Sequence, residues 1–245
     1  MALLGCILGI LWGAHFACWI QLSLHLTGLL PLSDSIQSLF GPNRIQLLWQ
    51  WCSYAVALCT FHLSEFFTTA IYNPTAVTAE SFLVNHSTGY TAAALTSWTE
   101  FGIRFLFFPR WNSLVVALVG LLVTAIAQTF RSLAMTTAAE SFNHLIQLSK
   151  KDSHVLITHG IYSILRHPSY VGFYYWSVSM QLVLGNFLHA ILFAVVSWSF
   201  FNRRIPFEEE SLCKLFPDEY PAYVSRTWTG IPFIYTQVVH APKLD

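Results

Sequence analysis

Long apolar stretches alternate with short polar segments over the first 130 residues. Four such stretches, at 2–30, 45–71, 89–107 and 112–130, are separated by segments that contain Pro, Gly, Thr or charged residues. A helix needs about 20 residues to cross the hydrocarbon core of a bilayer, and each stretch is close to or above that length. The pattern therefore predicts four membrane-spanning helices, with the fourth ending at Arg131.

The second half of the chain has a different pattern. Residues 132–149 place Leu and Ile among Ser, Asn, His and Gln at helical spacing, which predicts an interfacial helix or an extension of the fourth span. Two apolar arms, 171–184 and 187–202, then flank the turn residues Gly185-Asn186. Each arm would be only about 21–24 Å long. We therefore predict a helical hairpin that is packed inside the protein and is tilted or crosses incompletely. Pro206 then predicts a new short helix.

These elements predict an all-α, polytopic membrane protein with about six to eight transmembrane helices, including the short C-terminal hairpin. Its N-terminal helices, 1–130, and its C-terminal region, 131–245, would form one integrated membrane domain. The composition agrees, because 55% of the residues are hydrophobic and 10% are charged, whereas soluble domains have about 25% charged residues. The formal net charge of zero gives no basic footprint for a nucleic acid.

Basic residues predict the orientation. If the loops alternate sides across the four spans and the hairpin returns to its starting side, nine basic residues share one side and three share the other. The positive-inside bias places the larger group at the cytosolic face. The larger group is Arg131, Lys150, Lys151, Arg166, Arg203, Arg204, Lys214, Arg226 and Lys243, and the smaller group is Arg44, Arg104 and Arg110.

Polar chemistry concentrates in residues 156–172 and just after the hairpin. Pro168 suits the first position of a helix, whose free N–H groups could hold a carboxylate; alternatively, the preceding Arg166 and His167 simply mark the membrane border. Arg204 could hold a carboxylate with its planar fork, and Glu208 could hold an amino or hydroxyl group. The alternative is that Arg204 reaches toward lipid headgroups and the glutamates only cap the next helix.

Three further sets of residues have side chains that could carry chemistry. Glu65 and His62 lie one turn apart inside a predicted span, and a functional site and a packing hydrogen bond explain them equally well. The histidines show no metal-ligand spacing and have no cysteines among them, so no metal is expected. The five cysteines show no C-x-x-C spacing, and the four in apolar runs are interpreted as small buried hydrophobic residues.

Several motifs follow one another in the C-terminal region. Arg166-His167-Pro168-Ser169-Tyr170-Val171-Gly172 follows Gly160-Ile161-Tyr162; Gln181, Asn186, Arg204 and Glu208-Glu209 come next; Phe216-Pro217-Asp218-Glu219-Tyr220, Tyr223 and Thr229-Gly230-Ile231-Pro232-Phe233-Ile234 close the series. In this order and spacing, about residues 145–235 resemble isoprenylcysteine carboxyl methyltransferases. The residues before 140 resemble that family only as apolar spans.

The resemblance implies an enzyme of the endoplasmic reticulum membrane with a non-Rossmann cofactor pocket that faces the cytosol. Such enzymes transfer a methyl group from S-adenosylmethionine to the α-carboxylate of a C-terminal farnesylated or geranylgeranylated cysteine. The implied partners are processed, prenylated protein C-termini, such as those of small GTPases, together with membrane lipid. A carboxylate is already ionised at neutral pH, so this chemistry needs alignment, a positive clamp and dehydration but no general base.

The resemblance also implies roles for particular residues. Arg204 would be the catalytic residue that holds the substrate. The family often has Glu at the position of Val155, so the cofactor contact there is expected to run through the backbone. The implied cofactor contacts are Gln147, His154, Val155, Leu156, Ile157, Tyr162, His167, Pro168, Ser169, Tyr170 and Glu208.

Three alternatives share part of this pattern. Membrane sterol or steroid reductases have a similar Arg-His-Pro segment but bind NADPH, whose 2′-phosphate would require additional basic residues. Phospholipid N-methyltransferases act on amines, which an arginine clamp suits less well than a carboxylate. A membrane scaffold without enzymatic activity would need no pairing of Arg204 with Glu208 and would bind no cofactor.

Overall fold

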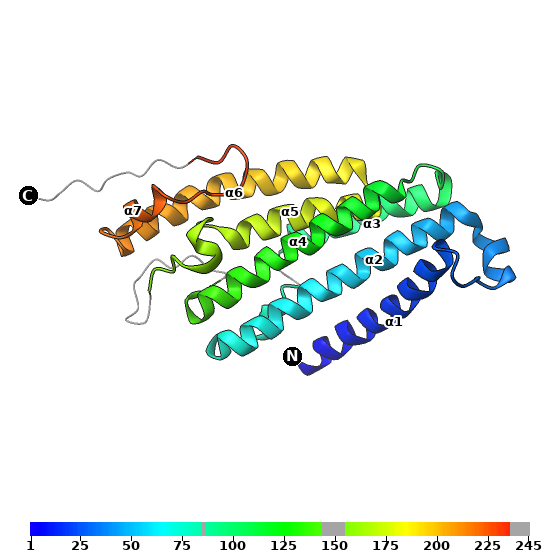
Figure 1. Ribbon diagram of the computed structural model, residues 1–245, viewed down its shortest axis with the longest axis horizontal. Helices are drawn as coiled ribbons and strands as arrows, with labels where there is room; N and C mark the ends of the chain where they lie inside the picture. Colours follow the sequence, from blue (N-terminus) through cyan, green and yellow to red (C-terminus); the bar gives the residue numbers. More distant parts are fainter. Residues whose placement is uncertain (85–86, 144–154, 236–245) are drawn as a thin grey trace, which may run out of the picture.

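The apolar stretches fold as long helices that lie side by side in a bundle (Figure 1). The computed structural model describes residues 1–84, 87–143 and 155–235. Over these residues there are no β-strands, only one isolated bridge between Leu165 and Trp228, and this agrees with the predicted all-α class. The helices are α1 (Ala2–Leu26), α2 (Asp34–Tyr72), α3 (Thr88–Phe107), α4 (Leu114–Ala138), α5 (Pro168–Leu184), α6 (Phe187–Leu215) and α7 (Tyr220–Val224). The single-turn 3₁₀ elements are η1 (Pro74–Ala76), η2 (Ala79–Phe82), η3 (Ala139–Ser141) and η4 (Gly160–Ser163).

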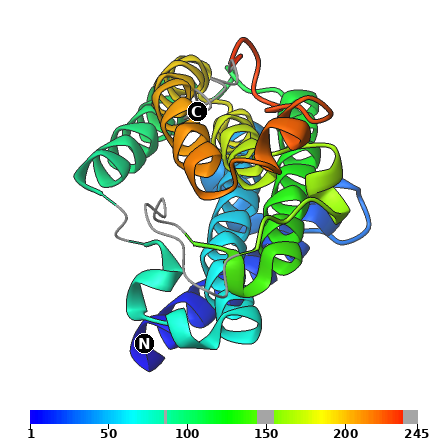
Figure 2. The same ribbon diagram turned by 90° about the vertical axis from the view of Figure 1, so that its left-hand side faces the viewer.

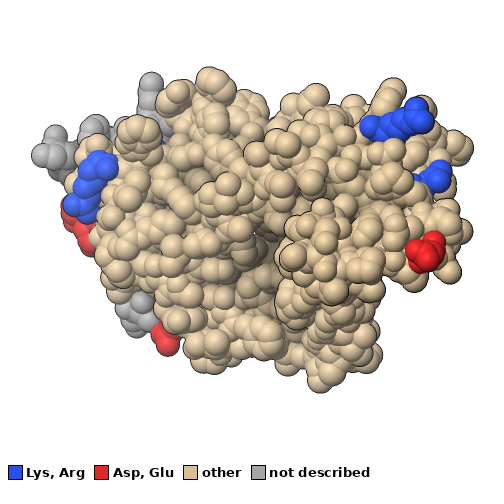
Figure 3. Space-filling view, turned by 45° about the vertical axis from the view of Figure 1, so that its right-hand side comes forward, with Lys and Arg blue, Asp and Glu red and all other residues tan. Residues whose placement is uncertain are grey.

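The surface and the helix lengths fit a membrane protein. In the described chain, three helical segments are long and apolar enough to cross a bilayer, namely Ala2–Leu26, Asp34–Tyr72 and Leu114–Ser141. Figure 3 shows one face on which Lys, Arg, Asp and Glu lie toward the two ends, with a broad uncharged band between them. Such a band matches the hydrocarbon core, which strongly disfavours charged side chains.

Two predicted helix ends are wrong. The fourth span does not stop at Arg131, because α4 continues to Ala138 and buries Arg131 against other helices. This continuation confirms the alternative prediction that residues after Arg131 extend the fourth span. The chain does not restart at Pro206, because α6 runs without interruption to Leu215. A proline removes one helical hydrogen bond, but α6 is packed against the protein on both sides of that position, because Ile205 before it and Glu209 after it are buried.

The first polar loop is also shorter than predicted. A helical segment begins already at Asp34, and α2 is kinked at Gly41, where φ is +67°. That backbone conformation favours glycine, and the following Pro42 lacks the N–H that a straight helix would use. Two reciprocal hydrogen bonds join α1 to α2: Trp19 Nε1 donates to Ser53 Oγ at 2.9 Å, and Trp49 Nε1 donates to Ser23 Oγ at 2.8 Å.

Most of α1 is not covered by other helices: only 6% of the residues in its most apolar 18-residue stretch are buried. Cys6 and Cys18 on this helix are consequently exposed, so the prediction that they are buried is wrong. Cys52 and Cys59 on α2 are buried, as predicted.

The predicted hairpin consists of α5, which is buried between other helices, and α6, which lies outside it (Figures 1 and 2). Helix α5 approaches α4 very closely at two glycines. A Cβ at Gly120 would lie 2.8 Å from the backbone nitrogen of Val183, and one at Gly172 would lie 2.8 Å from the carbonyl oxygen of Ala127. Because neither position can accept a side chain, the two helices hold a fixed register.

At the far end of the bundle, a buried polar network attaches α3 to the turn between α5 and α6. Ser97 Oγ donates to Gln181 Oε1 at 2.7 Å, and Asn186 Nδ2 donates to the Ser97 carbonyl at 2.8 Å. Arg104 Nη1 donates to the Leu184 carbonyl at 2.7 Å. Gln181 and Asn186, which belong to the family-like motifs, are therefore structural residues at the end of the bundle opposite the start of α5.

Candidate functional site

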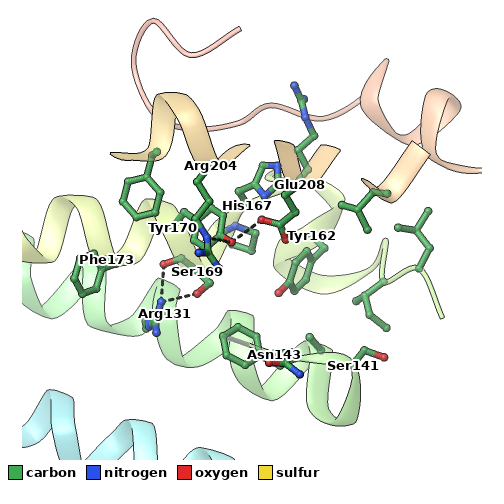
Figure 4. Close-up of a pocket in the computed structure, with 18 of the residues that line it drawn as sticks. Arg131, Ser141, Asn143, Tyr162, His167, Ser169, Tyr170, Phe173, Arg204 and Glu208 are labelled. Atoms are coloured by element: carbon green, nitrogen blue, oxygen red, sulfur yellow. Dashed lines mark hydrogen bonds between the residues drawn. The ribbon is translucent and has the colours of Figure 1, made fainter. Parts of the chain in front are cut away.

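A cavity lies at the end of the bundle where α4 and α6 finish and α5 begins (Figure 4). Its wall combines many aromatic and aliphatic side chains with polar groups, which gather where the start of α5 faces the second half of α6. The polar and charged lining residues of the helices, turns and tail include Arg131, Tyr162, Arg166, His167, Ser169, Tyr170, Arg204, Glu208, Tyr220 and Tyr223.

Tyr170 joins an arginine and a glutamate at this wall (Figure 4). Its hydroxyl accepts a hydrogen bond from Arg204 Nε at 2.8 Å and donates one to Glu208 Oε2 at 2.5 Å. Arg204 and Glu208 are four residues apart on α6 and so share a helix face. The Arg204 guanidinium also lies 5.4 Å from the Tyr170 ring centroid and 5.7 Å from that of Phe200. One cation and one anion are thus held side by side at the cavity by a shared hydroxyl.

Arg166 and His167 do not simply mark a membrane border. Arg166 Nε donates to Glu209 Oε1 at 2.6 Å, and His167 Nε2 lies 2.9 Å from the same oxygen. All three side chains are buried, with 4–8% of their surfaces exposed. The His167 ring stacks on the Tyr170 ring at a centroid distance of 5.4 Å. The pair with Glu209 therefore orients the residues that precede α5, and Glu209 does more than cap a helix.

A cluster of tyrosines outside the long helices forms another part of the wall. Tyr162 donates to the Ala134 carbonyl at 3.3 Å, and Tyr223 donates to the Tyr162 carbonyl at 2.7 Å. The buried hydroxyl of Tyr220 has no hydrogen-bond partner among the described residues. Burial raises the pKa of Tyr162 and of Tyr220 well above the usual value for tyrosine, and the negative charge of Glu208 raises both further. These hydroxyls are therefore protonated at neutral pH.

The cavity brings together nearly all of the residues that the sequence pointed to. Gln147 and His154 lie outside the described residues, so their positions stay predictions. Val155 is 64% exposed and yet contributes to the lining. The predicted site residues that line the cavity are Val155, Leu156, Ile157, Tyr162, His167, Pro168, Ser169, Tyr170, Arg204 and Glu208.

Sequence reasoning missed the role of Arg131 and left that of Glu65 undecided. Glu65 is fully buried in α2, and both of its carboxylate oxygens accept hydrogen bonds from Arg131, at 2.6 and 2.9 Å. The sequence contained a signal for this pairing, because the Glu65 carboxylate lies inside an apolar span and a carboxylate there requires a polar or cationic partner. His62 is occupied differently, with Nδ1 2.8 Å from the Phe82 carbonyl.

No group of three or more potential metal ligands occurs within the described ranges. The polar groups of the cavity are instead arranged for an organic ligand that carries charge. They comprise a cation with a planar fork, a carboxylate, protonated tyrosine hydroxyls and aromatic faces that can accept a cation.

Comparisons with known proteins agree with these features. The profile of the isoprenylcysteine carboxyl methyltransferase family matches residues 118–214. Protein-S-isoprenylcysteine O-methyltransferase from Homo sapiens is 41% identical over 219 residues, which is 89% of this chain and 73% of that protein. The protein of the same name from Tribolium castaneum is 40% identical over 221 residues, 90% of this chain and 78% of its own length.

A solved structure extends the likeness to three dimensions. This structure, of a eukaryotic intramembrane Ras methyltransferase, matches with a TM-score of 0.75 at 41% sequence identity. The match covers 81% of this chain and 70% of the other. The similarity therefore includes N-terminal helices that the motifs alone, which begin near residue 145, did not reach.

Proposed function

The chain belongs to the isoprenylcysteine carboxyl methyltransferase family, and we propose that it methylates the α-carboxylate of a C-terminal prenylated cysteine with S-adenosylmethionine as the methyl donor. The observation that carries this proposal is the hydroxyl of Tyr170, which holds Arg204 and Glu208 beside each other at one cavity. A carboxylate acceptor and a cationic donor must meet at one place, and this pair offers a group of opposite charge to each.

The residues present fit S-adenosylmethionine. The Glu208 carboxylate and the aromatic ring of Tyr162 suit a ligand that carries positive charge. When bound, the cofactor supplies an electrophilic methyl group on a positively charged sulfur. The proposed contacts are Gln147, His154, Val155, Leu156, Ile157, Tyr162, His167, Pro168, Ser169, Tyr170 and Glu208.

Arg204 is the proposed substrate-binding and catalytic residue. Its Nε is committed to Tyr170, and this bond turns the guanidinium toward the cavity in a fixed orientation. A fork held in this way can align a carboxylate with two hydrogen bonds. Because a carboxylate is ionised at neutral pH, Arg204 has only to orient the nucleophile, and no residue has to remove a proton.

The apolar part of the wall has a separate task. Phe61, Phe173, Phe200 and Phe201 exclude water from the cavity and offer a surface to a farnesyl or geranylgeranyl chain. A dehydrated carboxylate interacts more strongly with its clamp and is less shielded from an electrophile. These walls suit the processed C-termini of prenylated proteins, such as small GTPases, that arrive in the plane of a membrane.

We further propose that the cavity faces the cytosol in the endoplasmic reticulum membrane. The cavity end contains most of the basic residues among those described, since Arg166, Arg203 and Lys214 lie near it. Arg44 donates to the carbonyls of Phe105 and Leu106 at the opposite end. This asymmetry has the direction that the positive-inside bias requires.

The alternatives fit the cavity less well. An NADPH enzyme needs basic groups for the 2′-phosphate, but of the arginines that line the cavity, Arg131 forms an ion pair with Glu65 and Arg166 with Glu209. An amine substrate, as in phospholipid N-methyltransferases, would be repelled by Arg204. A scaffold would not require the oriented pair at all.

The test compares cofactors directly. The purified protein in lipid nanodiscs is titrated with S-adenosylmethionine and, separately, with NADPH, and methyl transfer to a farnesylated cysteine derivative is followed with a labelled methyl donor. We expect saturable binding of S-adenosylmethionine and formation of a base-labile methyl ester. Binding of NADPH alone, or methylation of an amine in preference to the carboxylate, would contradict the proposal.

A further inference from the structure

Among the described residues, the ion pair between Arg131 and Glu65 is the most completely buried charged contact near the cavity. Arg131 Nε and Nη2 reach the two Glu65 oxygens at 2.6 and 2.9 Å, and the two residues are 6% and 0% exposed. The guanidinium also lies 5.8 Å from the ring centroids of Phe61 and Phe173. Removing two charges from water is so costly that such a pair is poor evidence for stability alone. The other contacts of the Arg131 side chain therefore indicate the role of this ion pair.

The third arm of the guanidinium points to the beginning of α5 (Figure 4). Arg131 Nη1 donates to Ser169 Oγ at 2.7 Å and to the Ser169 carbonyl at 3.3 Å. Ser169 is the second residue of α5 and is bonded directly to Tyr170. The guanidinium therefore contacts the residue that immediately precedes the one joining Arg204 to Glu208.

The backbone of α4 at Arg131 also packs against the first turn of α5. A Cβ at Gly172 would lie 2.8 Å from the Arg131 backbone nitrogen, so the first turn of α5 rests directly on this part of α4. One turn further along α4, the Ala134 carbonyl accepts the hydroxyl of Tyr162, another lining residue. The pair with Glu65 fixes the Arg131 side chain, and the contacts of Arg131 fix the start of α5.

We infer that Arg131, locked by Glu65, is a positioning residue for methyl transfer: through Ser169 it holds the first turn of α5 where Tyr170 can orient both Arg204 and Glu208. This inference rests on the proposed function. It assigns to an ion pair beneath the cavity the task of setting the distance between the substrate clamp and the cofactor site. Small errors in that distance lower the rate strongly, since a shift of about 1 Å can reduce it by about 10²-fold.

The chain offers a matched control at the other end of the bundle. Arg104 is buried to a similar degree, at 8% exposure, and donates to the carbonyls of Leu184 and Trp111 at 2.7 and 2.6 Å. It contributes nothing to the lining of the cavity. Arg104→Lys and Arg131→Lys thus each remove the fork of a buried arginine and retain its charge, but only the second disturbs α5 where it enters the site.

The experiment measures kcat and KM for both substrates in nanodiscs for the wild type, Arg131→Lys, Arg104→Lys, Ser169→Ala and the double variant Arg131→Lys/Ser169→Ala. We expect Arg131→Lys to lower kcat by about tenfold to 10²-fold at saturating substrates, with KM for the prenylcysteine changed less than kcat. Ser169→Ala keeps the ion pair intact and should lower kcat without lowering the unfolding temperature. In the Arg131→Lys background, Ser169→Ala should have little further effect on kcat, because the link is already lost.

Each other outcome decides against the inference. If Arg104→Lys loses as much kcat as Arg131→Lys, the loss reflects a damaged bundle. If Ser169→Ala retains full kcat at saturating cofactor, or if the two losses multiply, Arg131 does not act through Ser169. Should Arg131→Lys fail to fold, Ser169→Ala still refutes the inference if its kcat at saturating S-adenosylmethionine equals that of the wild type. A wild-type protein that binds S-adenosylmethionine but forms no methyl ester would instead refute the proposed function, which keeps the two failures distinct.

Discussion

At the scale of single residues, Arg204 and Glu208 contact the same Tyr170 hydroxyl but have different proposed roles, namely binding of the substrate and binding of the cofactor. Arg204 donates to Tyr170, and Tyr170 donates to Glu208, so one hydroxyl lies between the cation proposed to hold the carboxylate and the anion proposed to hold the cofactor. The shared hydroxyl sets the direction of each group. Removing either charged residue should consequently affect one ligand far more than the other.

Arg204→Ala is expected to lower methyl transfer by about 10²-fold or more because the acceptor carboxylate is no longer aligned. Binding of S-adenosylmethionine, measured by calorimetry, should persist. Arg203→Ala is the matched control, since the neighbouring Arg203 lies on the exposed side of α6 and donates to Ser199 Oγ at 3.0 Å; it should retain activity. An equal loss of cofactor affinity in Arg204→Ala would contradict the division of tasks.

Glu208→Ala should mainly weaken cofactor binding. A hydrogen bond to a charged group contributes about 1.5–3 kcal/mol, so the dissociation constant should rise by about tenfold to 10²-fold. Glu210→Ala serves as the control, because Glu210 is exposed and pairs with the likewise exposed Lys214 one turn away. If the cofactor affinity of Glu208→Ala is unchanged, the assignment of Glu208 is wrong.

At the scale of elements, the site depends on how closely α5 lies against α4. Gly172 permits an approach that no other residue would allow, because a Cβ there would lie 2.8 Å from the Ala127 carbonyl and from the Arg131 nitrogen, both backbone atoms. Backbone atoms in two packed helices cannot move aside individually. Any side chain at this position must push the start of α5, and with it Tyr170, away from α4.

Gly172→Ala should therefore destabilise the protein by about 1–3 kcal/mol and reduce activity further than the stability loss explains. Gly102→Ala on α3 is the comparison, because a Cβ there meets nothing within 4 Å, and alanine favours a helix over glycine by up to about 1 kcal/mol. Thermal unfolding in detergent and methyl transfer in nanodiscs check both variants. Equal melting temperatures for the two would show that the close approach does not constrain the helices.

At the scale of the whole molecule, the asymmetry of the two ends defines an orientation. The cavity lies at the end where α4 and α6 finish, and the first turn of α2 lies at the other end (Figure 1). Asp34 in that first turn and Glu210 near the end of α6 are both exposed. They are therefore suitable positions from which to read the orientation.

In a variant whose five natural cysteines are replaced by serine, a cysteine at position 210 should react with a membrane-impermeant maleimide added to the cytosolic side of intact microsomes. A cysteine at position 34 should react only after the membrane is permeabilised. The reverse pattern would place the cavity in the lumen and contradict the positive-inside argument.

The tyrosine cluster should make the folded protein sensitive to alkaline pH. Burial raises the pKa of Tyr162, Tyr220 and Tyr223 above the ordinary value, which is about 10. The folded state therefore keeps protons that the unfolded state releases, so this contribution to stability is complete below about pH 10 and is lost as the pH rises further. The unfolding temperature should fall above that pH, and less steeply in Tyr220→Phe. An identical slope in that variant would refute the prediction.

The sequence by itself determined the class of the protein and the identity of its candidate site. Apolar stretches of bilayer length dictate helices, since only a helix or a closed barrel satisfies the backbone in lipid. The motifs that begin at Gly160 include Tyr162, residues 166–170, Arg204 and Glu208, whose side chains line the cavity, because residue type and order are written directly in the chain.

The tertiary structure alone decided which charges meet. Arg131 follows an apolar stretch, and this pattern predicts a helix end, but Glu65 of α2 lies beside Arg131, and a paired charge does not have to reach the aqueous surface. Likewise, Arg166 and His167 gained their partner in Glu209 only when α6 packed against the start of α5. Pairings between residues some 40 to 70 positions apart depend on helix register and distance, and a one-dimensional pattern does not contain these.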